Sequence, residues 1–293
     1  MTKQNRNGTT RIAIASGKGG TGKTTVATNL VVQAAESGYR AVYGDCDVEE
    51  PNGHLFLCPT IETSRPFSLE VPSVVEERCT GCGKCGEVCE YSAIVVINKK
   101  VLTFPELCHS CGGCWLVCPE DAIEKGAREI GVVETGGAFD TVDFVQGRLR
   151  IGEAMAPPLI KSVKEGASDV DLQVFDAPPG TSCPVIQTVR DADYVLLVTE
   201  PTPFGLNDLR LAVEMLRALK KPFGVVINRA DVGDDGVSRY CAEEEIEILK
   251  EIPDDRKVAE AYARGDIAVR VFPEYRDMFQ DLLDKVTERA GRA

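Results

Sequence analysis

The sequence lacks the features that define several large classes of protein. No apolar run approaches the roughly 18–20 residues that a membrane span needs, and the opening MTKQNRNGTTR contains no apolar core of a signal peptide. Basic residues are outnumbered, with 33 Lys and Arg against 46 Asp and Glu and a net charge of −13. Such a charge repels phosphate backbones and anionic lipid. We therefore expect a cytoplasmic protein whose partners are proteins, with no nucleic-acid or membrane binding.

Histidine is scarce, whereas cysteine is abundant. The two histidines, His54 and His109, have no metal-ligand companions at fixed spacing, so neither predicts a metal site. Twelve cysteines are many for a reducing compartment, in which a disulfide framework is not expected. Eight of them fall between Cys79 and Cys118, and the other four are scattered. This clustering indicates metal binding.

A glycine-rich stretch follows the first apolar run of the chain. Residues 17–25 read GKGGTGKTT and match the phosphate-binding pattern G-x-x-x-x-G-K-[ST], between a predicted strand and a predicted helix. Backbone N–H groups in such a loop hold phosphates, Lys23 is expected to neutralise the β- and γ-phosphates, and the Thr24 hydroxyl is expected to bind Mg²⁺. The pattern needs only one lysine, so Lys18 requires another explanation. The predicted nucleotide-binding residues of the loop are Gly17, Lys18, Gly19, Gly20, Thr21, Gly22, Lys23, Thr24 and Thr25.

Three aspartates lie at the carboxyl ends of predicted strands, where ligands bind in parallel sheets. Asp45 and Asp47 end one strand, and Asp176 lies in the segment FDAPPG. Asp176 is expected to hold Mg²⁺ through water, Asp45 to support the metal, and Asp47 to orient the attacking water. A lone aspartate after a strand is more often a helix cap, but these three occur together with a phosphate loop. The sequence thus predicts ATP hydrolysis.

Outside the cysteine cluster, short apolar runs alternate with helical segments, the pattern of a mostly parallel sheet flanked by helices. Residues 46–171 separate the second predicted strand from the third, far more than a usual crossover needs. The predicted fold class is therefore α/β, a P-loop NTPase with a small inserted domain. The predicted strands are Arg11–Ser16, Arg40–Asp45, Leu172–Ala177, Asp193–Glu200, Phe223–Asn228 and Ile246–Ile252, and helices are predicted at about 22–36, 184–191, 205–219, 237–244, 255–264 and 273–289.

The inserted segment contains an internal repeat. ERCTGCGKCGEVCEYSAI aligns with ELCHSCGGCWLVCPEDAI, and all four cysteines coincide in the spacing C-x2-C-x2-C-x3-C. In this spacing three close thiolates hold one cubane cluster and the fourth ligates the other cluster, whereas structural zinc, the alternative, favours two separated pairs. The sequence therefore predicts two 4Fe-4S clusters, the first on Cys79, Cys82, Cys85 and Cys118, the second on Cys89, Cys108, Cys111 and Cys114.

The predicted domains follow from this arrangement. An ATPase domain comprises 1–68 and 128–293, and 69–127 form an α+β domain that resembles a bacterial two-cluster ferredoxin. So small a domain has almost no apolar core, so we expect the clusters to hold it together. Trp115, between cluster cysteines, is interpreted as cover for a cluster, with a partner contact as the alternative.

Four segments carry a family resemblance. GKGGTGKTT, GDCDVEEPNGHLF, FDAPPGTSCP and VVINRAD resemble the deviant-Walker ATPases that include the MinD, ParA and Mrp proteins and the nitrogenase iron protein. With its insert, the chain is similar to MinD/Mrp-like ATPases that carry a ferredoxin domain. The resemblance implies a homodimer, or a dimer with a closely related chain, in which ATP is sandwiched and Lys18 reaches the partner's phosphates. Lys18 would then join Lys23 and Asp47 in the catalytic set. The resemblance also implies that Asn228 contacts the adenine edge, with Arg229 beside it.

Two departures limit what the resemblance implies. Cys183 lies at the spacing from Asp176 at which the nitrogenase iron protein carries a ligand for its bridging cluster, but no second cysteine occupies a comparable loop. We interpret Cys183 as a buried thiol at a helix start. The C-x-x-C pair that Mrp-type cluster carriers place near the C-terminus is absent, which weakens a direct transfer of the scaffold function.

Three functions are compatible with these features. The first is an ATP-hydrolysing dimer that gates electron transfer from its clusters to a redox or metallocluster partner protein. The second is a factor that assembles or inserts metal-sulfur clusters. The third is a regulatory ATPase whose clusters sense the redox state. Because a full set of cysteine ligands favours retention of a cluster over its transfer, the sequence favours the first function.

Overall fold

The computed structural model describes residues 8–139, 141–167 and 170–292. The opening residues 1–7, on which the expectation of no signal peptide partly rests, lie outside the described residues. The body of the protein is built on a nine-stranded sheet in the order β11-β10-β9-β1-β8-β2-β7-β6-β3. Its parallel strands are β1 (Thr10–Ala15), β2 (Ala41–Asp45), β7 (Val142–Leu149), β8 (Leu172–Asp176), β9 (Tyr194–Thr199), β10 (Phe223–Asn228) and β11 (Ile248–Ile252).

Helices cover both faces of the sheet, which explains why its strands are apolar along their length. On β1, Ile12 and Ile14 face a core shared with α1, α10 and α11, whereas Ala13 and Ala15 face a core shared with α6, α7 and α8. A third core lies under α5. The helices of the body are α1 (Lys23–Glu36), α2 (Gly53–Leu57), α5 (Ala156–Gly166), α6 (Cys183–Val189), α7 (Pro203–Ala218), α8 (Gly236–Glu243), α9 (Arg256–Ala263), α10 (Ala268–Val271) and α11 (Pro273–Ala290).

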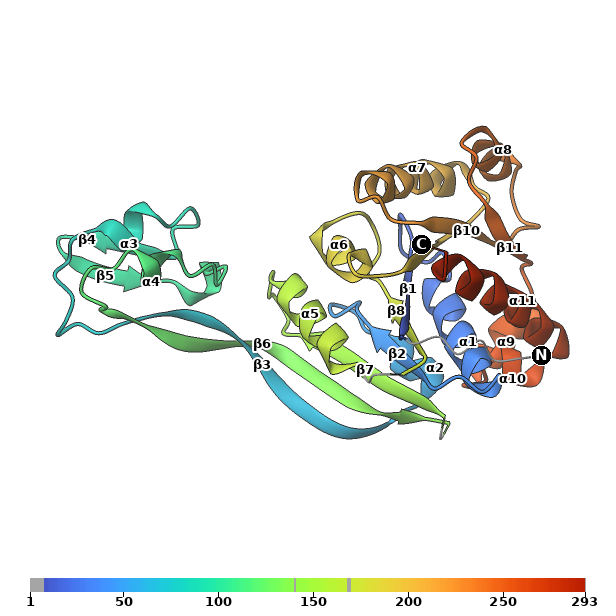
Figure 1. Cartoon of the computed structure of the whole chain (residues 1–293), viewed down its shortest axis with the longest axis horizontal. Helices are drawn as coiled ribbons and strands as arrows, with labels where there is room; N and C mark the ends of the chain where they lie inside the picture. Colours follow the sequence, from blue (N-terminus) through green and yellow to red (C-terminus); the bar gives the residue numbers. More distant parts are fainter. Residues whose placement is uncertain (1–7, 140, 168–169, 293) are drawn as a thin grey trace.

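A long antiparallel ribbon leaves the edge of this sheet (Figure 1). It consists of β3 (Thr60–Val74) and β6 (Ile123–Ala138), which pair from Thr60 with Gly137 to Val74 with Ile123. The base of β6 also pairs antiparallel with β7. The ribbon therefore belongs to the main sheet at one end and extends away from the body at the other.

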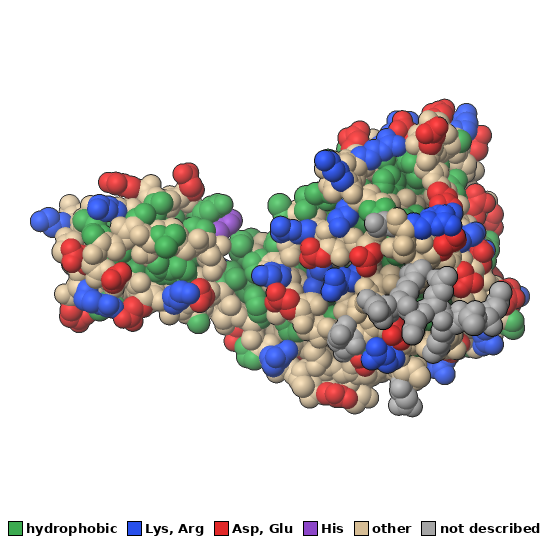
Figure 2. All heavy atoms as spheres, viewed as in Figure 1, with side chains coloured by type: hydrophobic (Ala, Val, Ile, Leu, Met, Phe, Trp, Pro, Cys, Tyr) green, Lys and Arg blue, Asp and Glu red, His purple; other side chains and the backbone are tan. Residues whose placement is uncertain are grey.

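The far end of the ribbon carries a small module, residues 75–122. Its elements are α3 (Lys84–Glu87), β4 (Ile94–Ile97), β5 (Lys100–Thr103), a 3-10 turn (Pro105–Leu107) and α4 (Gly113–Leu116), and β4 and β5 form a separate two-stranded sheet. Figure 2 shows apolar surface on the module, between acidic and basic side chains. The module is set well apart from the helices of the body.

The α/β fold and all six predicted strands are confirmed, with small differences at their ends. The ribbon, β7 and α5 were not predicted. The first half of β3, residues 60–66 at the edge of the main sheet, is exposed on both faces, so it lacks the apolar alternation by which a strand is recognised. The predicted domain boundaries at 68/69 and 127/128 fall inside the two ribbon strands, so the chain crosses them without a linker.

Candidate nucleotide site and cysteine cavities

The phosphate loop connects β1 to α1. Gly20 and Gly22 have φ angles of 80° and 91°, a left-handed conformation that favours glycine, and Gly22 is the N-cap of α1. No side chain caps the helix, and no acidic residue lies in its first turn. Its first N–H groups are thus available to an anion. Lys23, the first helical residue, is buried at this point.

Thr24 and Asp176 lie side by side, as a magnesium site requires. The Thr24 hydroxyl donates to Asp176 Oδ2 over 2.6 Å, and the Tyr43 hydroxyl donates to the same oxygen over 3.1 Å. Burial raises the pKa of Asp176, and the nearby Lys23 opposes that rise. Asp176 Oδ1 is buried and has no partner within the described residues. An enclosed carboxylate oxygen beside a hydroxyl is a donor set that suits Mg²⁺.

The Asp45 carboxylate accepts hydrogen bonds from the backbone of the segment that follows it. It is fully buried and pairs in register with Asp176 across β2 and β8. One carboxylate oxygen accepts from Asp47 N at 3.1 Å, and the other accepts from Asn52 N at 3.2 Å and Gly53 N at 2.9 Å. Burial and then the charge of Asp176 raise its pKa. Asp45 therefore fixes segment 47–53 and the start of α2, and its expected metal role stays a prediction.

Asp47 lies between the phosphate loop and the buried aspartates. Burial raises the pKa of its carboxyl to about 6, against the opposing attraction of Lys23. A carboxyl group with this pKa accepts a proton readily near neutral pH. Its position is compatible with the predicted orientation of water.

Lys18 is held within its own chain by Glu200, at the end of β9. Lys18 Nζ lies 3.6 Å from Glu200 Oε2, and Arg229 Nη1 lies 3.0 Å from Glu200 Oε1. The Asn228 side-chain amide donates to Thr21 O over 2.9 Å. Asn228 and Arg229 are therefore next to the phosphate loop, and the contact of Asn228 with adenine stays a prediction. Glu200 was not predicted as a site residue, although its place at the end of a strand is a usable signal.

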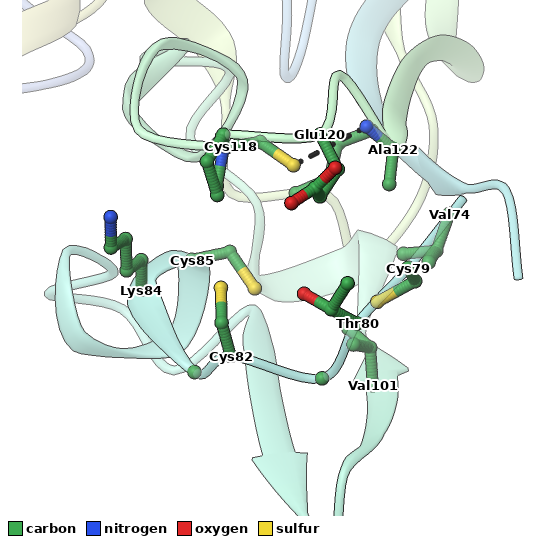
Figure 3. Close-up of a pocket in the computed structure, with 14 residues that line it drawn as sticks. Val74, Cys79, Thr80, Cys82, Lys84, Cys85, Val101, Cys118, Glu120 and Ala122 are labelled. Atoms are coloured by element: carbon green, nitrogen blue, oxygen red, sulfur yellow. Dashed lines mark hydrogen bonds between the residues drawn. The ribbon is translucent and has the colours of Figure 1, made fainter.

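The eight clustered cysteines line two cavities in the module. The first is lined by Cys79, Cys82, Cys85 and Cys118, and Figure 3 shows their sulfur atoms turned toward a common space. The second is lined by Cys89, Cys108, Cys111 and Cys114. Each cavity thus takes three cysteines from one repeat and the fourth from the other, the division that the spacing predicts.

Backbone N–H groups point at two of these sulfur atoms. Ala122 N donates to Cys118 Sγ over 3.3 Å, as drawn in Figure 3, and Ser110 N donates to Cys108 Sγ over 3.4 Å. Gly81, Gly83 and Gly112 have positive φ angles, which let the backbone turn around the cavities. Between residues 8 and 292, in the described parts, no three His, Cys, Asp or Glu side chains are arranged to hold a single metal ion.

The other cysteines lie outside these cavities. Cys183 begins α6 and is exposed, so the prediction of a buried thiol is wrong. The segment before α6 runs over the surface, and the first helical residue points outward. Cys46 and Cys241 are buried, and Cys58 is exposed. None of the helices in the described part of the chain has the length and apolar character needed to cross a bilayer.

The strand, phosphate loop and helix, with carboxylates at the ends of neighbouring strands, define a P-loop nucleotide-binding protein. Residues 12–269 match the family model described as the CobQ/CobB/MinD/ParA nucleotide binding domain. The chain belongs to this family of MinD/ParA-type ATPases.

The chain is also similar to individual proteins. The chain is 30% identical over 270 residues to an uncharacterized protein of Methanocaldococcus jannaschii, covering 91% of this chain and 93% of that protein. It is 24% identical over 302 residues to an iron-sulfur cluster carrier protein of Pyrococcus horikoshii, covering 96% and 88%. The structure of the septum site-determining protein MinD of Pyrococcus horikoshii, complexed with Mg-ADP, superposes with a TM-score of 0.61 at 22% identity, covering 97% and 98%. This last similarity establishes the fold alone.

Proposed function

We propose that this chain is an ATP-hydrolysing dimeric switch that gates electron transfer from two 4Fe-4S clusters to a partner protein or metallocluster. One observation carries the proposal. Two four-cysteine cavities lie at the end of a ribbon whose first strand begins just after the segment that Asp45 fixes beside the phosphate loop. A nucleotide site and a redox module are thus joined by ordered elements.

The residues of each cavity fit an iron-sulfur cluster. Four thiols per cavity are the ligand number of a 4Fe-4S cubane, and backbone N–H groups directed at sulfur stabilise such clusters. The first would be held by Cys79, Cys82, Cys85 and Cys118, and the second by Cys89, Cys108, Cys111 and Cys114. When bound, each cluster stores one electron for transfer.

In the nucleotide site, the described side chains have separable tasks. Lys23 and the N-terminus of α1 bind phosphate oxygens, and Thr24 with Asp176 holds Mg²⁺, which neutralises phosphate charge. Asp47 orients the attacking water and accepts its proton. Lys18 leaves Glu200 and reaches the partner chain's ATP, so the site is complete only in the dimer.

The path from the nucleotide site to the root of the ribbon is short. Asp176 pairs in register with Asp45, and Asp45 holds Asn52 and Gly53 at the start of α2. Cys58 follows α2, and β3 begins at Thr60. A rearrangement of segment 47–53 on ATP binding therefore acts on the root of the ribbon. By linkage, nucleotide and redox state must then influence each other.

An anaerobic EPR redox titration tests this proposal. It is performed without nucleotide, with MgADP, and with MgATP on the Asp47→Asn variant, which holds the ATP state. We expect a nucleotide-dependent shift of tens of millivolts, where about 59 mV corresponds to a tenfold change for a one-electron couple. If neither cluster changes its reduction potential among the three nucleotide states, gating is excluded.

Cluster delivery is the second candidate function, because relatives across nearly the whole chain are named iron-sulfur cluster carrier proteins. Transfer to an acceptor requires that a cluster leave its four cysteine ligands. Incubation of the loaded protein with apo-ferredoxin and MgATP distinguishes the two functions. Transfer on the timescale of ATP turnover supports delivery, and retention of both clusters supports electron gating.

A further inference from the structure

The internal repeat allows the two cavities to be compared position by position. With the offset that aligns Cys79 with Cys108, Gly83 corresponds to Gly112, and Gly86 corresponds to Trp115. In the first repeat the third cysteine is followed by a glycine, which has no side chain. In the second repeat it is followed by the only tryptophan of the chain. This is the largest difference between the two repeats.

Trp115 lines the second cavity together with its cysteines. Its indole nitrogen is enclosed and has no hydrogen-bond acceptor within the described residues. A buried N–H without an acceptor is unfavourable and rare in folded proteins. The enclosed donor is therefore available to a partner other than the described protein atoms.

The indole is held firmly from two sides. A Cβ atom built on Gly112 would lie 3.2 Å from Trp115 Cε3, so the glycine makes room for the ring. On the corresponding Gly83, a Cβ would meet nothing nearer than Glu87 Oε1 at 3.8 Å. Lys125 Nζ lies 5.5 Å from the centre of the indole ring, and Glu70 holds that ammonium at 2.9 Å. In the folded module, these contacts set the position of the ring.

We propose that Trp115 donates its indole N–H to a sulfur atom of the cluster on Cys89, Cys108, Cys111 and Cys114, which makes this cluster the more easily reduced of the two. The proposal rests on the proposed function, since it requires that clusters bind. A donor to sulfur stabilises the added negative charge of the reduced cluster and so raises its potential.

Other polar side chains also line the two cavities. The first cavity is lined by Lys84 and Glu120, whose opposite charges offset each other. The second is closed on another side by Tyr91 and His109, whose rings stack with centroids 3.5 Å apart. The enclosed indole N–H is a donor of the second cavity that has no counterpart at Gly86 of the first repeat.

The first test is an EPR redox titration of the loaded Trp115→Phe variant beside the wild type. Phenylalanine keeps an aromatic ring against Gly112 but removes the N–H. We expect one cluster to become about tenfold harder to reduce, a shift of about 59 mV to lower potential, while the other is unchanged. Leu116→Ala is the matched control, because Leu116 is the next residue and its surface is 88% exposed. It is expected to titrate as the wild type.

The second test needs no substitution and so holds even if the variant fails to fold. Because the chain has one tryptophan, protein labelled with ¹⁵N at the indole nitrogen reports on Trp115 alone. ENDOR spectroscopy should detect ¹⁵N and exchangeable proton coupling to the cluster that is reduced first. Coupling to the other cluster, or to neither, overturns the proposal.

The outcomes separate this inference from the proposed function. Iron and sulfide analysis shows whether two clusters bind. A protein that binds none contradicts the proposed function and the inference together. A protein that binds two clusters, with the same potentials in the Trp115→Phe variant, overturns the inference and leaves the proposed function standing.

Discussion

The body and the module hold their candidate sites in opposite ways. The strands that carry the phosphate loop and Asp176 are buried from both faces by large apolar cores. In the module, the two small clusters of buried residues include Cys85, Cys108 and Cys114 themselves. In the body, the core positions the ligand-binding residues, whereas in the module those residues form much of the core. Binding of a ligand should therefore matter little for the folding of the body and greatly for that of the module.

The largest predicted effect follows from loss of the clusters. In iron-free protein, or with Cys82→Ala and Cys111→Ala combined, residues 75–122 should lose protection against hydrogen exchange, because few apolar contacts remain to order them. Residues 8–45 should keep their protection and ATP binding. Cys58→Ser is the control, since Cys58 is exposed and outside the cavities. A module that stays protected without iron would contradict the comparison.

Next in size is the effect of Lys18→Ala on ATP turnover. We expect ATPase activity to fall by about 10³-fold and ATP-dependent dimerisation to be lost, as for removal of a cation supplied in trans. Cluster content should be unchanged. Because the pair with Glu200 is partly exposed, its loss should alter stability by less than about 1 kcal/mol. Lys161→Ala, in an exposed pair on α5, is the matched control. Analytical ultracentrifugation with MgATP checks the result, and normal dimerisation would refute the role of Lys18.

A smaller effect concerns pH. Because burial raises the pKa of Asp47 to about 6, the carboxylate forms above this pH and is protonated below it. ATP turnover should therefore be near its full value from about pH 7, half of it near pH 6, and fall toward tenfold per pH unit below about pH 5. The Asp47→Asn variant should be slow at every pH. Steady-state rates from pH 5 to 8 measure this, and a wild-type rate that does not change between pH 5 and 7 would exclude Asp47 as the group that accepts the proton.

The sequence predicts the body better than the connection between body and module. Strands buried on both faces, such as Ile12 to Ala15, are recognisable as apolar runs, and the phosphate loop is recognisable from its glycines. Cysteine spacing predicts the division of ligands between the two cavities, because the spacing reflects the shape of a cubane. The edge of the sheet where the ribbon starts leaves no such signal, since residues 60–66 of β3 are exposed on both faces.

Some side-chain contacts within the nucleotide site could not be predicted from the sequence. The role expected of Asp45 beside the metal stays a prediction, and the hydrogen bonds that its carboxylate accepts from Asp47, Asn52 and Gly53 N–H groups were not foreseen. Tyr43 and Glu200 were not expected in the site, although both contact predicted site residues. These contacts depend on the register of β2 with β8 and of β1 with β9, which the sequence of single strands does not contain.

The central claim is that nucleotide and redox state are coupled through the root of the ribbon. Because coupling is reciprocal, the most direct measurement is the affinity of the Asp47→Asn variant for MgATP, determined anaerobically on oxidised and on fully reduced protein. The account predicts that oxidised and reduced protein bind MgATP with affinities that differ severalfold. By reciprocity, this factor equals the one calculated from the nucleotide-dependent shift in reduction potential. Equal affinities in protein that carries both clusters would contradict it.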